Sequence, residues 1–173
     1  GTRPLLTANH GLTGIRAESL LNDLTGSARM QGSGDVFLQI STDISNSRST
    51  LEALSGDIGM SMLDGAIVGI DVTDTIGAVK SAPGKQSAIK RKSSPEQTTE
   101  FAELTMSGVF NKGTLNSDDL LMLSPLLRAT GEGSFNLVDE TMDYVLKPVL
   151  LGDAGKAMGK LNGIAIPVRL SGN

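Results

Sequence analysis

Along much of this chain, apolar side chains recur at every second position, the periodicity of a β-strand with one buried face. Between residues 51 and 72 the pattern predicts a helix end, a strand, a tight turn, a second strand and the start of another helix. The turn falls at Asp64-Gly65, a dipeptide that favours hairpins because both residues tolerate positive φ. We therefore predict an antiparallel hairpin whose apolar face carries Ile58, Met60, Met62, Ala66, Val68, Ile70 and Val72.

Further segments alternate in the same way. One predicted strand covers Asp35–Ser41, and four more follow after residue 100. Their apolar positions are Ala102, Leu104, Met106 and Phe110; Leu127, Ala129, Gly131, Gly133, Phe135 and Leu137; Met142, Tyr144 and Leu146; and Ile164, Ile166, Val168 and Leu170. Turn residues at 111–113, 124–125 and 139–140 separate these runs, and Pro167 predicts that the last strand is an edge strand or bulged.

Short helices are predicted at Ala17–Leu24, at Ser47–Leu54 and at residues 72–80. We expect an α+β, predominantly β fold: a curved antiparallel meander or half-barrel groove with about three short helices packed on its apolar face. Residues 1–173 then form a single domain, interrupted by a polar, basic and flexible loop at 83–98. Lys90-Arg91-Lys92 in this loop fits a solvated linker, or a patch that contacts lipid headgroups.

Composition removes several function classes. The absence of cysteine excludes disulfides and thiolate chemistry, and a net charge of −4 gives no general footprint for nucleic acid. Aromatic residues make up only 3% of the chain, whereas aliphatic residues and seven methionines suit a partner without fixed shape. No apolar run approaches the roughly 20 residues that span a bilayer. A start at Gly1-Thr2 indicates a cut or processed chain, with any anchor outside it.

Catalytic chemistry finds little support in the sequence. His10 is the single histidine and has no carboxylate at a metal-ligand spacing. The acidic pairs Asp118-Asp119 and Asp139-Glu140, with Asp71 and Asp74, are predicted to lie in turns or helix starts as solvated or capping groups. We therefore expect no enzyme activity, no catalytic residue, no metal and no cofactor.

At this point two blocks of sequence resemble a known family. Leu51, Leu54, Gly56, Asp64-Gly65, Ile67, Gly69, Ile70 and Asp71 are similar to the carboxy-terminal region of the AsmA family of Gram-negative envelope proteins. The block from Gly108 to Leu146 resembles the strand series before the family's closing motif, which is GIAIPVRLSGN at Gly163–Asn173. The resemblance covers roughly residues 15–173.

This resemblance implies a large protein anchored in the inner membrane by an amino-terminal helix, with its bulk in the periplasm. The family is similar to bridge-like lipid-transfer proteins, whose curved sheets form a hydrophobic groove for acyl chains, and it is implicated in phospholipid traffic to the outer membrane. No catalytic residues are carried over. The implied partners are phospholipid acyl chains, with other envelope proteins as further partners and no nucleic acid.

Two functions stay open on the residues themselves. The apolar strand faces can line the terminal part of a lipid groove, or the helices can fill that face and leave a structural or protein-interaction module that supports outer-membrane assembly. For the groove, the candidate lining residues are Met60, Met62, Val68, Ile70, Leu104, Met106, Phe110, Leu127, Phe135, Leu137, Met142, Leu146, Ile166 and Val168.

Overall fold

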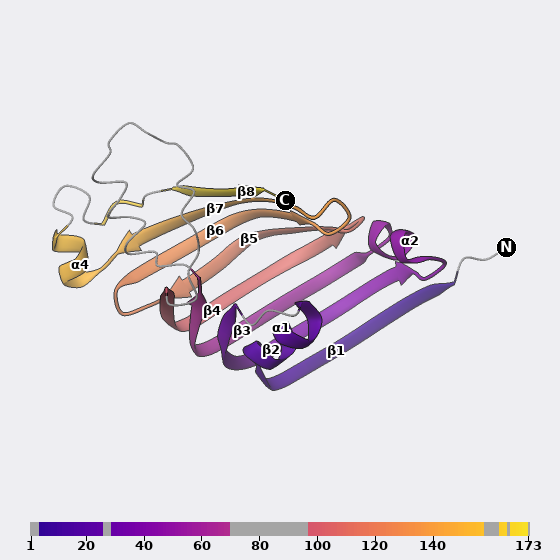
Figure 1. Ribbon diagram of the computed structural model, residues 1–173, viewed down its shortest axis with the longest axis horizontal. Helices are drawn as coiled ribbons and strands as arrows, with labels where there is room; N and C mark the ends of the chain where they lie inside the picture. The colour runs from indigo at the N-terminus through magenta and orange to yellow at the C-terminus, as the bar shows by residue number, and fades with distance from the viewer. Residues whose placement is uncertain (1–3, 26–28, 70–96, 158–162, 166, 173) are drawn as a thin grey trace.

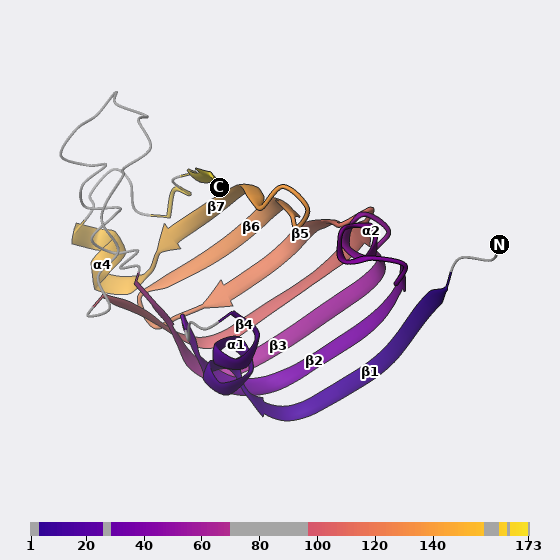
Figure 2. The same cartoon turned by 45° about the vertical axis from the view of Figure 1, so that its right-hand side comes forward.

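The computed structural model describes residues 4–25, 29–69, 97–157, 163–165 and 167–172. Its strands form one eight-stranded antiparallel sheet in the order β1-β2-β3-β4-β5-β6-β7-β8, so each strand pairs with its neighbours in sequence (Figure 1). They are β1 (Leu5–Arg16), β2 (Met30–Asp43), β3 (Ser55–Val68), β4 (Thr98–Asn111), β5 (Thr114–Leu123), β6 (Leu127–Asn136), β7 (Thr141–Leu150) and β8 (Val168–Gly172). The predicted meander is confirmed, and the sheet is open, with β1 and β8 at its two edges (Figure 2).

The described helices are α1 (Ala17–Thr25), α2 (Ser47–Glu52) and α4 (Gly152–Ala157). The first two confirm the helices predicted at 17–24 and 47–54, whereas the helix predicted at 72–80 lies outside the described residues. The expectation that about three helices pack on the apolar face is not confirmed. α1 places Ala17 in the core, but α2 contacts β2 and α4 contacts β7, toward opposite ends of the strands (Figure 1).

The core lies on one face of the sheet. Successive residues of a strand point to opposite faces, and residues paired across strands share a face. The face that carries Met62 and Leu104 is the buried one, with Ala17 of α1 in its cluster, while the opposite face is largely exposed and polar. The buried cluster on the apolar face consists of Ala17, Met62, Phe101, Leu104, Met122, Leu127, Ala129 and Leu150.

The hairpin predicted at Asp64-Gly65 is wrong, because β3 runs through this dipeptide without reversing. Gly65 pairs with Phe101 of β4, and the residues before it pair with β2 and β4 alike. Asp64 does adopt the positive φ of a turn residue, at 47°, but that conformation bends the strand. A Cβ on Gly65 would lie 2.4 Å from the Phe101 ring, so the glycine makes room for this packing. On the β2 side the pair is a β-bulge, because Asp64 and Gly65 lie opposite the single residue Gly32, whereas the register with β4 is unchanged through the bend.

The burial pattern of β4 and several strand boundaries also differ from the prediction. At the bend opposite Asp64, the apolar phase of β4 shifts, so Phe101 is buried and Ala102 is exposed. Leu137 follows β6 in an exposed turn, and Ile164 is exposed before β8 begins. The predicted turns at 111–113 and 139–140 are confirmed, and β8 is an edge strand as predicted. β1 and β5 are strands that sequence analysis did not identify.

Candidate functional site

A continuous row of apolar residues crosses the sheet perpendicular to its strands. Strand pairing joins Leu12 to Val36, Val36 to Met60 and Met60 to Met106. On β5, Leu121 pairs with Thr105, so the next residue along the ladder, Leu120, lies beside Met106. The row then continues to the far edge of the sheet. We call it the central row: Leu12, Val36, Met60, Met106, Leu120, Gly131, Leu146 and Val168.

The central row is only partly covered. Its side chains are half-buried on β2, β3, β4, β5, β7 and β8, and Leu12 on β1 is 44% exposed. No member of the row carries a charge. With strands about 4.8 Å apart, eight strands give the row a length of about 34 Å. Each leaflet of a bilayer contributes roughly half of its ~30 Å hydrocarbon core, so the row is about twice as long as one acyl chain.

Closed packing borders the row on its α1 side and, around Tyr144 on β5 to β7, on the other side, whereas Leu38 and Ile58 on β2 and β3 are half-buried. Toward α1 lie the buried Met62, Leu104 and Met122 of the core cluster. On the other side Tyr144 is 2% exposed, with its ring centroid 5.2 Å from that of Phe135. The Tyr144 hydroxyl lies 3.3 Å from the Ser117 hydroxyl, so both buried polar groups have a partner. The row is therefore a half-open strip whose Met60 and Leu120 pack against the core cluster, with a second packed zone beside it on β5 to β7.

The predicted lining residues divide among these zones. Met60, Met106, Leu146 and Val168 belong to the central row, while Met62, Leu104 and Leu127 are buried in the core cluster. Phe110, Phe135 and Met142 share the apolar face beyond the strip, and Val68 lies at the end of β3. Leu137 lies outside any strand, and Ile70 and Ile166 are outside the described residues.

Sequence reasoning missed part of the row. Val36 lies in a strand that was predicted, and its alternation with Leu38 and Ile40 was the available signal. Leu120 was missed because the extra residue at Asp118-Asp119 shifts the alternation of β5, and Leu120 and Leu121 are both apolar. Leu12 lies on β1, where apolar residues fall on both faces of the strand. The missed members therefore concentrate on strands with irregular patterns.

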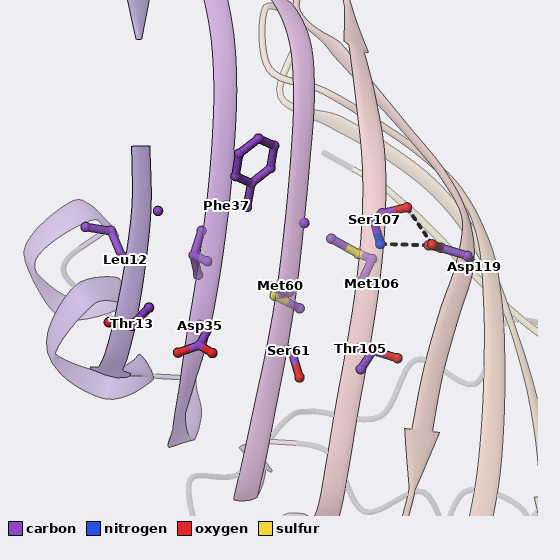
Figure 3. A pocket seen from close by; sticks show the side chains of 13 residues that line it. Leu12, Thr13, Asp35, Phe37, Met60, Ser61, Thr105, Met106, Ser107 and Asp119 are labelled. Atoms are coloured by element: carbon purple, nitrogen blue, oxygen red, sulfur yellow. Dashed lines mark hydrogen bonds between the residues drawn. The ribbon is translucent and has the colours of Figure 1, made fainter. Parts of the chain in front are cut away.

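Two β-bulges flank the central row, and at each bulge an aspartate carboxylate accepts a hydrogen bond from a backbone amide. β1 has an extra residue after Leu12, where the Gly14 amide donates to Asp35 Oδ1 at 2.9 Å. β5 has an extra residue at Asp118-Asp119, where the Ser107 amide donates to Asp119 Oδ1 at 2.7 Å and the Ser107 hydroxyl donates to Oδ2 (Figure 3). The prediction that Asp118-Asp119 forms a turn or helix start is therefore wrong: the pair is a β-bulge.

The electrostatics of the β5 bulge follow from these bonds. Partial burial raises the pKa of Asp119, but hydrogen bonds from the Ser107 side chain and backbone outweigh it and leave the pKa below its usual value. Asp35 and Asp119 border a shallow hollow of about 470 Å³ on the polar face (Figure 3). Its floor includes Gly59, which pairs with the exposed Phe37 on one side and Ser107 on the other.

No group of three or more histidine, aspartate or glutamate side chains that could hold a metal ion occurs in the described ranges. His10 lies exposed on β1. Across the same ranges, no helix is both long and apolar enough to cross a membrane.

The described residues thus form an open antiparallel β-meander with one apolar face and a half-open apolar strip across its strands. The family model described as AsmA family matches residues 5–120, and the chain belongs to this family. The match covers β1 to β4 and most of β5; the last three strands lie beyond it. Neither a search of curated proteins nor a search of solved structures returns a match. Membership associates the chain with the cell envelope and suggests a role in lipid transport or envelope assembly.

Proposed function

We propose that this domain binds phospholipid acyl chains along the central row, as the terminal part of a hydrophobic groove for phospholipid transport between the inner and outer membranes. The observation that carries the proposal is the uncharged, half-open row that crosses all eight strands. It has side chains such as Met60 and Met106, which adapt to a ligand without fixed shape. Membership of an envelope-associated family supports the same conclusion.

The energetics favour transient occupancy. Covering one methylene group contributes about 0.8 kcal/mol, so about ten covered methylenes contribute about 8 kcal/mol. Association costs about 4–15 kcal/mol in lost translational and rotational freedom. The two terms are of similar size, so apolar contact alone gives weak, reversible binding. A surface of this kind can pass a lipid along, whereas a closed pocket with polar anchors would retain it.

In this proposal the domain is not an enzyme and uses no cofactor. It acts in the periplasm as part of a protein that is anchored in the inner membrane through a segment outside this chain. Its partners are phospholipid acyl chains, with other envelope proteins as secondary partners and no nucleic acid.

Native mass spectrometry of the chain purified from a Gram-negative host, followed by lipid extraction, tests the proposal. We expect co-purifying phospholipid, and we expect Met106→Asp to remove it because a charge in the strip must be desolvated. Thr130→Asp is the matched control, since Thr130 is exposed on the polar face opposite Lys147. Lipid retained by a folded Met106→Asp variant, or no lipid on the unmodified chain, would contradict the proposal.

A second candidate function is protein interaction through the edge of β1. Between Leu5 and Ile15 this edge strand carries no lysine, arginine, aspartate or glutamate, and Leu5 is 70% exposed and Leu6 49% exposed. Natural edge strands are usually protected by charge, proline or shortness, so an unprotected edge favours the addition of a strand from another protein. The opposite edge, β8, is only five residues long.

Crosslinking in envelope extracts distinguishes the two candidates. The interaction module predicts a defined protein partner that is lost when Thr7 and Asn9 are replaced by lysine, together with a chain free of lipid. A lipid-loaded chain that captures no envelope protein would leave the first candidate alone.

A further inference from the structure

We infer that Asp119 is a positioning residue for the lipid path: its carboxylate holds the β5 bulge so that Leu120 takes its place in the central row. The inference rests on the proposed function, because it assigns a role within the same strip.

The register shows what the bulge achieves. Ser117 pairs with Gly133, and Leu120 pairs with Gly131, so two residues of β5 face one residue of β6. Without the extra residue, Asp119 would lie opposite Gly131. A carboxylate would then stand in the central row, and Leu120 would move to the polar face, because a slip of one residue exchanges the two faces of a strand. The bulge thus decides whether a leucine or an aspartate lines the path.

The carboxylate of Asp119 replaces the bonding that the bulge disrupts. Regular pairing of β4 with β5 stops at Thr105 and resumes at Val109, and Ser107 lies between them. Asp119 accepts both the Ser107 amide and the Ser107 hydroxyl. A hydrogen bond to an ionised group stabilises more than a neutral one, so these two bonds favour the bulged register over the regular one.

The same device occurs at the other bulge. Asp35 accepts the Gly14 amide, and the extra residue there places Ile15, in place of Gly14, opposite Gly34 on the apolar face. Leu12 precedes the first bulge and Leu120 follows the second, so the two bulges bracket the part of the row on β1 to β5. Asp35 alternates with Val36 and Asp119 bonds Ser107, which alternates with Met106, so both carboxylates lie on the face opposite the central row.

The test uses the full 173-residue chain loaded from vesicles of phosphatidylethanolamine and phosphatidylglycerol that carry a diazirine-tagged acyl chain. Crosslink yield at Leu120 is measured by mass spectrometry, and exchange of the Ser107 amide is followed by NMR. Asp119→Ala should speed this exchange about tenfold and lower the Leu120 yield about fivefold. Asp119→Asn, which retains an acceptor for the amide, should restore most of both. Asp118→Ala removes a neighbouring charge and should match the unmodified chain.

Each outcome bears on a separate claim. An unchanged Leu120 yield in Asp119→Ala, or an equal loss in Asp118→Ala, overturns the inference and leaves the proposed function standing. An unmodified chain without crosslinks on the apolar face overturns both. If Asp119→Ala fails to fold, Ser107→Ala decides: it keeps the amide donor but loses the hydroxyl, so we expect about a twofold loss of yield, and no loss overturns the inference.

Discussion

Truncating Leu104 and truncating Met106 should separate the closed core from the half-open strip, although the two residues lie on the same face of β4. Leu104 is 3% exposed and belongs to the core cluster, so Leu104→Ala should cost about 2–5 kcal/mol of stability. Met106 is half-buried, and we expect Met106→Ala to cost about 1 kcal/mol.

Urea unfolding measures this difference. A domain of this size loses roughly 2–3 kcal/mol per molar urea, so the midpoint should fall by about 1–2 M for Leu104→Ala and by less than about 0.5 M for Met106→Ala. Lipid loading should show the reverse order. Met106→Ala removes three heavy atoms that a bound acyl chain would cover, up to about 2 kcal/mol, which weakens loading by up to about 30-fold.

Loading is measured with fluorescent phospholipid at a temperature where both variants are folded. The reasoning would be refuted if Met106→Ala destabilised the chain as much as Leu104→Ala does, because the strip would then be an ordinary closed core. It would equally be refuted if Met106→Ala left loading unchanged while Leu104→Ala, still folded, abolished it.

Three further predictions concern the packed zone around Tyr144 and the β7–β8 edge. Gly131→Ala should cost about 1–3 kcal/mol by urea unfolding, because the new Cβ would lie 2.7 Å from the Tyr144 ring. Tyr144→Phe should cost about 1 kcal/mol in the same assay, since it leaves the buried Ser117 hydroxyl without its partner. The hydrogen bonds and charge of Arg169 lower the pKa of Asp143 below its ordinary value of 3.8. The contribution of this pair to β8 pairing is therefore complete above that value and is lost as the pH falls through the lowered pKa, which NMR of the β8 amides would follow.

Controls sharpen these three tests. Gly59→Ala adds a Cβ that meets nothing within 4 Å, so a cost equal to that of Gly131→Ala would show that the Tyr144 ring is not the cause. Ser117→Ala combined with Tyr144→Phe should cost little more than Tyr144→Phe alone, and strict additivity would exclude the bond between them. Asp143→Asn should remove the acid-induced change at β8; a change that persists would belong to another group.

Alternation predicted the meander and its apolar face because strands such as β2 and β7 keep one face apolar over most of their length. It could not give the central row, because the row depends on register between strands, and two bulges shift that register. The extra residue at Asp118-Asp119 is also the reason that β5 was not predicted, since it interrupts the alternation of apolar and polar residues along this strand. At Asp64-Gly65 the local signal for positive φ was correct, but the dipeptide forms a β-bulge against β2 within a strand that continues along β4.

The strict sequential order of the strands gives this architecture an unusual freedom in length. Since each strand pairs only with its neighbours in sequence, a hairpin can be inserted or removed without rearranging the strands that remain. Each added hairpin lengthens the apolar strip by about 10 Å, whereas its width is fixed separately by the residues along each strand. The length and the width of the strip can therefore change independently in evolution or in design. The number of hairpins sets the length, and the side chains within each strand set the width.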